Sequence, residues 1–227
     1  MKNETLKELQ EALNELNFIK ENSEKVNPRI NRAIKNLNHA IFLETPRSVG
    51  KFNIYDWVSD DALRPVLGGI FHDNGFEVAS DGHVLVCLKS DYEPELEGRI
   101  IDKFGESVCG SYPNYMSIKP KNNKIEVEVD TDKVYDALRE HKARKKAAGK
   151  GGYVPRCVIR IGNKCYFYLD NFKKFCGFLE MKNNFKIKIE HANRAAMTEC
   201  EDGSWALIMP LLYDEGMDWI IVDADKK

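Results

Sequence analysis

The sequence predicts an α+β protein in which antiparallel sheets are covered by helices, preceded by an N-terminal helical hairpin. Three observations lead to this fold class. The first 45 residues carry apolar stripes at helical spacing, an Asn-Gly pair lies between two apolar runs, and after residue 121 short strand-like runs alternate with amphipathic segments. At 227 residues, the chain is long enough for one large domain or two small ones.

Two amphipathic helices are expected before residue 45. The second begins after Asn27-Pro28, where Asn27 suits the N-cap and Pro28 the first turn, and it ends at Thr45-Pro46. Their narrow seams predict either a hairpin packed on its own domain or a contact with another subunit, and both interpretations remain open. The seam of the first helix, over residues 4–20, consists of Leu6, Leu9, Leu13 and Leu16.

A β-meander is expected between residues 63 and 88. Asn74-Gly75 favours a tight hairpin turn because both central positions of such a turn require positive φ. It joins the apolar runs 66–71 and 76–79. A second bend, Ser80-Asp81-Gly82-His83, leads into a third run over residues 84–88, and short strands are expected at 100–101 and 108–109.

The rest of the chain alternates strands and helices. Residues 125–129 alternate as in an edge or half-buried strand, and Asp130 or Thr131 caps a helix over residues 132–148 with Val134, Ala137 and Leu138 facing inward. A helix over residues 171–181 follows with a phenylalanine stripe. The run 219–222 predicts an edge strand or a subunit contact. The other strands are expected at 158–161, 165–169, 185–190, 195–200 and 205–209.

Composition narrows the classes of function. Lys and Arg number 34 against 36 Asp and Glu, so the net charge of −2 gives no global attraction to nucleic acid, and only a local patch can supply one. The six cysteines form no CxxC pair, which favours reduced, buried thiols and predicts neither a metal site nor a disulfide framework. We expect no cofactor. Because no long apolar segment occurs, we expect a cytoplasmic protein with no membrane partner.

One local basic patch stands out in the helix over residues 132–148. Arg139, Lys142 and Lys146 recur at steps of three and four, so they share a face. Such a face would meet DNA phosphates without reading bases, although basic residues also complement the negative end of a helix dipole. The candidate DNA-binding residues are Arg139, Lys142, Arg144, Lys145, Lys146 and Lys150.

Four motifs occur in a characteristic order. They are Arg-Pro-Val-Leu-Gly-Gly at 64–69, Ala-Ser-Asp-Gly-His-Val-Leu at 79–85, Tyr-Pro-Asn-Tyr at 112–115 with Ile-Lys-Pro at 118–120, and Ile-Met-Pro-Leu at 208–211. Together, over residues 60–212, they resemble the middle and C-terminal domains of the bacterial DNA polymerase III beta subunit, the sliding clamp.

The sequence departs from the family pattern in two places. Residues 89–111 are too few for the half-domain that the family places there, and Val84 stands where the family has arginine. The resemblance therefore implies DNA-clamp-like domains, the first of them in abridged form. The expected division is a helical hairpin at 1–45, an abridged clamp-like domain at 46–120, a second clamp-like domain at 121–213 and a C-terminal tail at 214–227.

The resemblance also implies a function. It predicts a non-enzymatic protein of DNA replication that holds duplex DNA without sequence specificity and binds short peptides of replication or repair proteins. Clamp rings contain six domains, so if this chain closes a ring, the resemblance favours a homo-oligomer of three two-domain chains. The peptide groove carried over from the family is lined by Ser80, Gly82, His83, Leu85, Pro120, Met209, Pro210 and Leu211.

Two other functions stay open at this stage. The chain fits a clamp-derived interaction module that does not encircle DNA, and a hydrolase that uses His83. Against the hydrolase, the bend itself explains Asp81, and the sequence has no nucleophile motif or phosphate-binding glycine loop, so no catalytic residue is expected. The groove hypothesis makes a structural prediction: the Asp81-Gly82-His83 bend and Met209-Pro210-Leu211 should be close in space.

Overall fold

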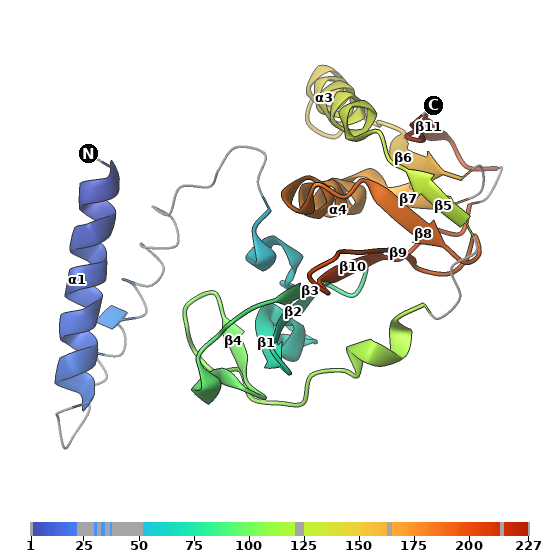
Figure 1. Cartoon of the computed structure of the whole chain (residues 1–227). Helices are drawn as coiled ribbons and strands as arrows, with labels where there is room; N and C mark the ends of the chain where they lie inside the picture. The colour runs from blue at the N-terminus through green and yellow to red at the C-terminus, as the bar shows by residue number, and fades with distance from the viewer. Residues whose placement is uncertain are drawn as a thin grey trace.

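A computed structural model describes residues 2–21, 30, 33–34, 37, 52–120, 125–162, 165–213 and 216–226. It shows an α+β architecture with one large antiparallel sheet, one small mixed sheet and two α-helices packed against strands of these sheets, while the N-terminal helix stands apart (Figure 1). Helix α1 (Lys2–Glu21) matches the first predicted helix. Apart from four isolated helical positions, the second helix of the predicted hairpin lies outside the described residues.

The large sheet has eight strands in the order β4-β1-β2-β3-β10-β9-β8-β5, with neighbouring strands antiparallel. Its two halves come from distant parts of the chain and meet where β3 pairs with β10. The strands are β1 (Gly69–Asp73), β2 (Phe76–Ser80), β3 (Val84–Lys89), β4 (Ile100–Asp102), β5 (Ile125–Glu128), β8 (Lys186–Ile189), β9 (Ala196–Glu199) and β10 (Trp205–Ile208).

The predicted hairpin turn is confirmed. Asn74 and Gly75 have φ values of 52° and 75°, both in the left-handed region that an Asn-Gly turn supplies at little cost. Two strand predictions were wrong. The run 66–71 becomes a strand only at Gly69, because Pro65 begins a 3₁₀ turn, η2 (Pro65–Gly68). Residues 108–109 form no strand: Ser107 makes an isolated bridge with Ile101 and the amide of Val108 donates to Ile100 O at 2.8 Å, but the ladder does not continue.

The small sheet contains three strands in the order β11-β6-β7, namely β6 (Arg156–Ile161), β7 (Cys165–Tyr168) and β11 (Trp219–Asp223). β11 pairs parallel to β6, so the predicted run 219–222 is an edge strand. The residues after β11 return to the large sheet, where the amide of Asp130 donates to Ala224 O at 2.8 Å and that of Lys226 to Glu128 O at 2.9 Å. The C-terminal segment thereby joins the two sheets.

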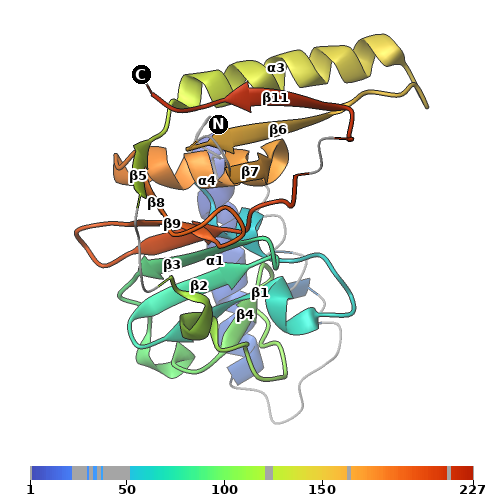
Figure 2. The same cartoon turned by 90° about the vertical axis from the view of Figure 1, so that its right-hand side faces the viewer.

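Helices α3 (Thr131–Ala148) and α4 (Leu169–Lys182) lie side by side against the strands (Figures 1 and 2). As predicted, Asp130 caps α3 by accepting from the amide of Lys133 at 3.3 Å, and Val134, Ala137 and Leu138 are buried. The phenylalanine stripe of α4 is also confirmed, because Phe172, Phe175 and Phe178 are fully buried between the sheets and helices. The shorter 3₁₀ segments are η1 (Ile54–Trp57), η3 (Pro94–Leu96) and η4 (Tyr115–Ile118).

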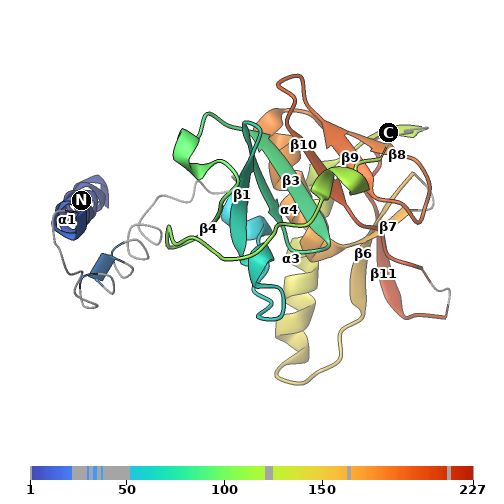
Figure 3. The same ribbon diagram turned by 90° about the horizontal axis from the view of Figure 1, so that it is seen from below.

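The two faces of the large sheet pack against different partners. Val86 and Ala206 belong to the core that contains α3 and α4, whereas Leu85 and Leu207 belong to a second cluster with Tyr115 of η4. Figure 3 shows η4 crossing the central strands on this second face. Four of the six cysteines are buried as expected, but Cys109 is exposed and Cys200 is half-buried, because they lie in a loop and at a strand end.

Candidate functional site

The pairing of β3 with β10 brings the Asp81-Gly82-His83 bend next to the end of β10. Val84 and Ile208 are register partners, and beyond them the amide of Met209 donates to the carbonyl of His83 at 2.8 Å. The predicted proximity of these two segments is therefore confirmed (Figure 3).

Four of the eight predicted groove residues share one face of the sheet. Ser80 pairs with Leu85 and Leu85 with Leu207, so these side chains form one row across three strands. His83 and Met209 lie one residue beyond the ends of β3 and β10, and because the backbone hydrogen bond between them continues the ladder, alternation assigns both to this face. Leu85 and Leu207 are 3% and 1% exposed, whereas Met209 is 41% exposed and the side chain of His83 is 58% exposed. Leu85 and Leu207 are thus buried in the cluster that contains Tyr115, and His83 and Met209 are exposed at its edge.

Hydrogen bonds fix the bend that carries His83. Asp81 Oδ1 accepts from the amides of His83 at 2.8 Å and Val84 at 3.0 Å, and Asp81 Oδ2 accepts from Lys174 Nζ at 2.7 Å. Burial alone would raise the pKa of Asp81, but these hydrogen bonds outweigh it and hold the pKa below its usual value. Ser80 Oγ donates to Val84 O at 2.8 Å and accepts from the amide of Gly82 at 3.1 Å. Ser80 and Asp81 are thus occupied in shaping the bend.

His83 itself is poorly placed for acid–base catalysis with Asp81. Its Nδ1 lies 3.8 Å from Asp81 Oδ1, which is longer than a hydrogen bond, and that oxygen already accepts two amides. Gly82 has a φ of 90°, and the guanidinium of Arg64 lies over it. The bend is therefore held between Arg64 and Lys174, two residues that motif reasoning did not place at the site.

The other predicted groove residues are placed differently. Leu211 leaves the large sheet, and its amide donates to Tyr166 O at 2.7 Å, next to β7. Pro210 and Pro120 are half-buried. Lys119, next to Pro120, lies 5.0 Å over the ring of Trp205 and 2.8 Å from Glu199, so the linker runs over the same sheet face, but toward the opposite end of β10. Leu207 was missed, although its position two residues before Met209 signals the shared face.

The six candidate DNA-binding residues, five on α3 and Lys150 just after it, are all exposed. Arg139 is paired with Asp136, and Arg144 lies 3.6 Å from Glu140. Lys142, Lys145 and Lys146 form no ion pair with any described residue. Residues 142–150 are exposed without interruption, and Figure 2 shows this half of α3 extending beyond the neighbouring strands.

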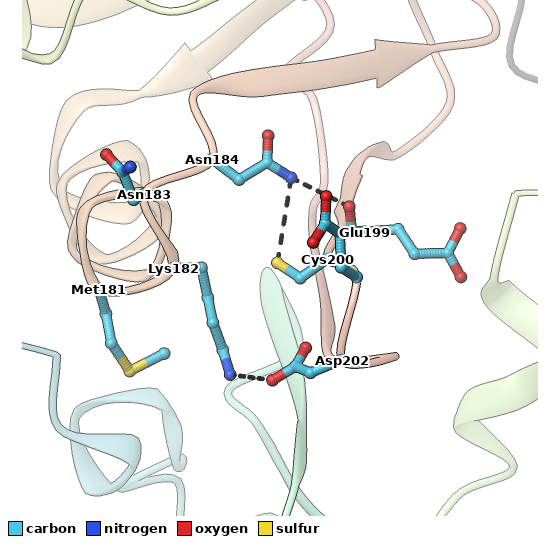
Figure 4. A pocket seen from close by; sticks show the side chains of 8 residues that line it. Met181, Lys182, Asn183, Asn184, Glu199, Cys200 and Asp202 are labelled. Atoms are coloured by element: carbon cyan, nitrogen blue, oxygen red, sulfur yellow. Dashed lines mark hydrogen bonds and ion pairs between the residues drawn. The ribbon is translucent and has the colours of Figure 1, made fainter.

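A separate pocket of about 590 Å³ lies between the end of α4 and the β9–β10 hairpin (Figure 4). Its polar groups largely satisfy one another: Lys182 Nζ donates to Asp202 Oδ2 at 2.5 Å, and Asn184 Nδ2 to Glu199 O at 3.0 Å. Burial raises the pKa of the Cys200 thiol. Across the described residues, no group of three His, Cys, Asp or Glu side chains is arranged to share a metal ion. The pocket is lined by Met181, Lys182, Asn183, Asn184, Glu199, Cys200, Glu201 and Asp202.

Comparison with known proteins finds the fold but no close relative. No family model and no curated protein matches the sequence. Among solved structures, the beta sliding clamp of Caulobacter crescentus matches with a TM-score of 0.53 and 14% identity, over 73% of this chain and 62% of that one. The DNA polymerase III subunit beta of Bartonella birtlesii matches with a TM-score of 0.51 and 14% identity, over 79% of this chain and 65% of that one.

These matches confirm the resemblance at the level of fold: the described chain has the sliding-clamp fold. It spans less than two thirds of the length of the clamps that it matches. No described helix combines the length and apolar character needed to cross a membrane.

Proposed function

We infer from the sliding-clamp fold and from the shared sheet face that this chain is a clamp-like, DNA-associated protein of replication that catalyses no reaction. It holds duplex DNA without sequence specificity and tethers replication or repair proteins through short peptides. The observation that carries the proposal is the β3–β10 pairing, which brings His83 and Met209 together beside Leu85 and Leu207.

The DNA-binding part of the proposal rests on α3. Exposed lysines that have no partner among the described residues are free to meet phosphates, and phosphate contacts release counterions. If Lys142, Lys145, Lys146 and Lys150 each meet one phosphate, the logarithm of the binding constant falls with the logarithm of salt concentration with a slope of about −3 to −4. Binding is weak and insensitive to sequence, since such contacts carry no base information.

The peptide-binding part rests on the rim of the groove, the exposed edge formed by His83 and Met209. An apolar groove with a few polar groups at its edge suits a short peptide with hydrophobic anchors. Met209 adds an adaptable thioether at the rim, which suits varied partners. Gly82 and Pro210, which adjoin His83 and Met209 in the chain, are proposed to border it. Leu211 lies toward β7 and Pro120 toward the other end of β10, so both are left out of this proposal.

A second candidate function follows from the first half of the fold. Within residues 52–120, all of which are described, the helical segments are short 3₁₀ turns and no α-helix forms. The first clamp-like unit therefore has no α-helix within residues 52–120, which favours a cytoplasmic interaction module that keeps the groove without encircling DNA. A trimeric ring and the four-part division of the chain remain proposals of the first candidate.

The two candidates are separated by reversing charges on α3. We expect the triple variant Lys142→Glu, Lys145→Glu, Lys146→Glu to lose binding to a fluorescent 30-base-pair duplex at low salt. The control variant Lys7→Glu, Lys20→Glu, Lys103→Glu makes the same change in net charge away from α3 and should bind normally. Equal binding by both variants would reject the role of α3. Native mass spectrometry with and without duplex then reports whether a ring-sized oligomer forms.

The groove is tested with an array of hexapeptides that carry leucine or phenylalanine at two positions. Met209→Asp should abolish capture, because a carboxylate would enter the apolar rim. Met217→Asp is the matched control, since Met217 is comparably exposed, at 47%, and lies outside the groove. Capture that survives Met209→Asp, or that Met217→Asp removes equally, would exclude the groove.

A further inference from the structure

Lys174 of α4 forms an ion pair with Asp81 across a sequence separation of 93 residues. Its Nζ lies 2.7 Å from Asp81 Oδ2, and the two side chains are only 28% and 14% exposed. A charge-assisted hydrogen bond at this degree of burial is stronger than a surface ion pair, because water screens it less. The contact connects the helices to the rim of the groove.

The two oxygens of Asp81 have different tasks. Oδ1 accepts from the amides of His83 and Val84, which sets the backbone of the bend. Oδ2 accepts from Lys174, which sets the orientation of the carboxylate. Without Lys174 the carboxylate can rotate toward water, and both amides lose a fixed acceptor. Lys174 therefore acts on His83 through Asp81.

Helix α4 is a rigid anchor for this contact. Phe172 and Phe175, on either side of Lys174, are fully buried in the main core. A residue on such a helix can hold a surface bend in place, because the helix cannot follow the bend outward without opening the core. The adjacent Lys173 is exposed and has no ion pair with any described residue, so it lacks this role.

We propose that Lys174 is a positioning residue for the groove: by holding Asp81 it fixes the backbone of His83 opposite Met209, and so determines how well the rim receives a peptide. The peptide-binding part of this inference rests on the proposed function. The positioning part concerns the free protein and is measured without any peptide.

Amide hydrogen exchange in the full chain tests the positioning. In Lys174→Met we expect the amides of His83 and Val84 to exchange about tenfold faster, as expected for the loss of one charged hydrogen bond. Lys173→Met should leave them unchanged, and Lys174→Arg should restore most of the protection. A double-mutant cycle that combines Lys174→Met with Asp81→Asn should show coupling. Each substitution alone should accelerate exchange of the His83 and Val84 amides, and the second should add little acceleration once the first is present.

The results distinguish this inference from a merely structural role and from failure of the proposed function. Unchanged exchange at His83 and Val84 in Lys174→Met overturns the inference, as does acceleration spread evenly over β3 and β10, which would indicate lost global stability. If the hexapeptide array shows no capture by the unsubstituted chain, the proposed groove function fails while the exchange data still decide the positioning. Where capture occurs, Lys174→Met should weaken it and Lys173→Met should not.

Discussion

Replacing Gly82 by alanine tests how tightly the bend at the groove is packed. Gly82 has a φ of 90°, which alanine adopts only with strain. A methyl group there would also lie 2.5 Å from Nη1 of Arg64, closer than real side-chain contacts come. The substitution therefore combines backbone strain with the displacement of a neighbour.

The two costs can be assigned separately. Left-handed backbone at a residue with a Cβ costs about 1–2 kcal/mol. Forcing a methyl group into filled space typically costs ~1–3 kcal/mol, and because Arg64 is flexible we expect about 1 kcal/mol here. The free energy of unfolding should therefore fall by about 2–3 kcal/mol, which for a chain of this size corresponds to a Tm lower by roughly 4–12 °C.

Gly98 offers a matched control. Its φ of 74° is also left-handed, yet a methyl group there would meet no atom within 4 Å. Urea unfolding followed by circular dichroism should show that the free energy of unfolding of Gly98→Ala falls only by the cost of the left-handed backbone. The double variant Gly82→Ala, Arg64→Ala should recover the part of the loss that comes from Arg64.

Equal losses in Gly82→Ala and Gly98→Ala would refute the claim that Arg64 packs over the bend. A double variant that is no more stable than Gly82→Ala would refute it as well.

Three further predictions concern the core, the C-terminus and the thiols. Phe175→Ala should lower the free energy of unfolding by about 3–5 kcal/mol with an unchanged urea m-value, because Phe175 is fully buried; a loss below 1 kcal/mol would contradict this packing. Removing residues 216–227 should abolish hydrogen-exchange protection of the Asp130 amide, which donates to Ala224 O, whereas retained protection would argue against the contact. Burial raises the pKa of the Cys87 thiol to about 12, so Cys87 stays protonated between about pH 7 and 9. In that range iodoacetamide should label the exposed Cys109 and spare Cys87 until urea is added. Early labelling of Cys87 would contradict its burial.

Local chemistry explains the elements that were predicted correctly. Asn74-Gly75 specifies its own turn, Asp130 caps α3, and the phenylalanine spacing of α4 defines its buried face. The errors lie where local signals conflict. Pro65 starts a 3₁₀ turn that takes in the first residues of the apolar run 66–71, and the apolar pair at 108–109 makes one backbone hydrogen bond to Ile100 without extending the ladder.

For the candidate site, the order of the motifs predicted which residues belong together but not how they lie in space. It indicated that Asp81-Gly82-His83 and Met209 belong together, and the β3–β10 pairing confirms their proximity. It did not place Arg64 or Lys174 at the site: Arg64 belongs to the 64–69 motif but was given no role at the bend, and Lys174 belongs to no motif.

The sequence by itself determined the Asn74-Gly75 turn, the Asp130 cap and the buried faces of α3 and α4, since these depend on residues within a few positions of one another. Only the tertiary structure decided which strand lies beside which. The parallel pairing of β11 with β6, the departure of Leu211 toward β7 and the Lys174–Asp81 contact all join residues more than 40 positions apart. Their formation depends on how whole elements pack, and the periodicity of a single segment carries no information about its partner.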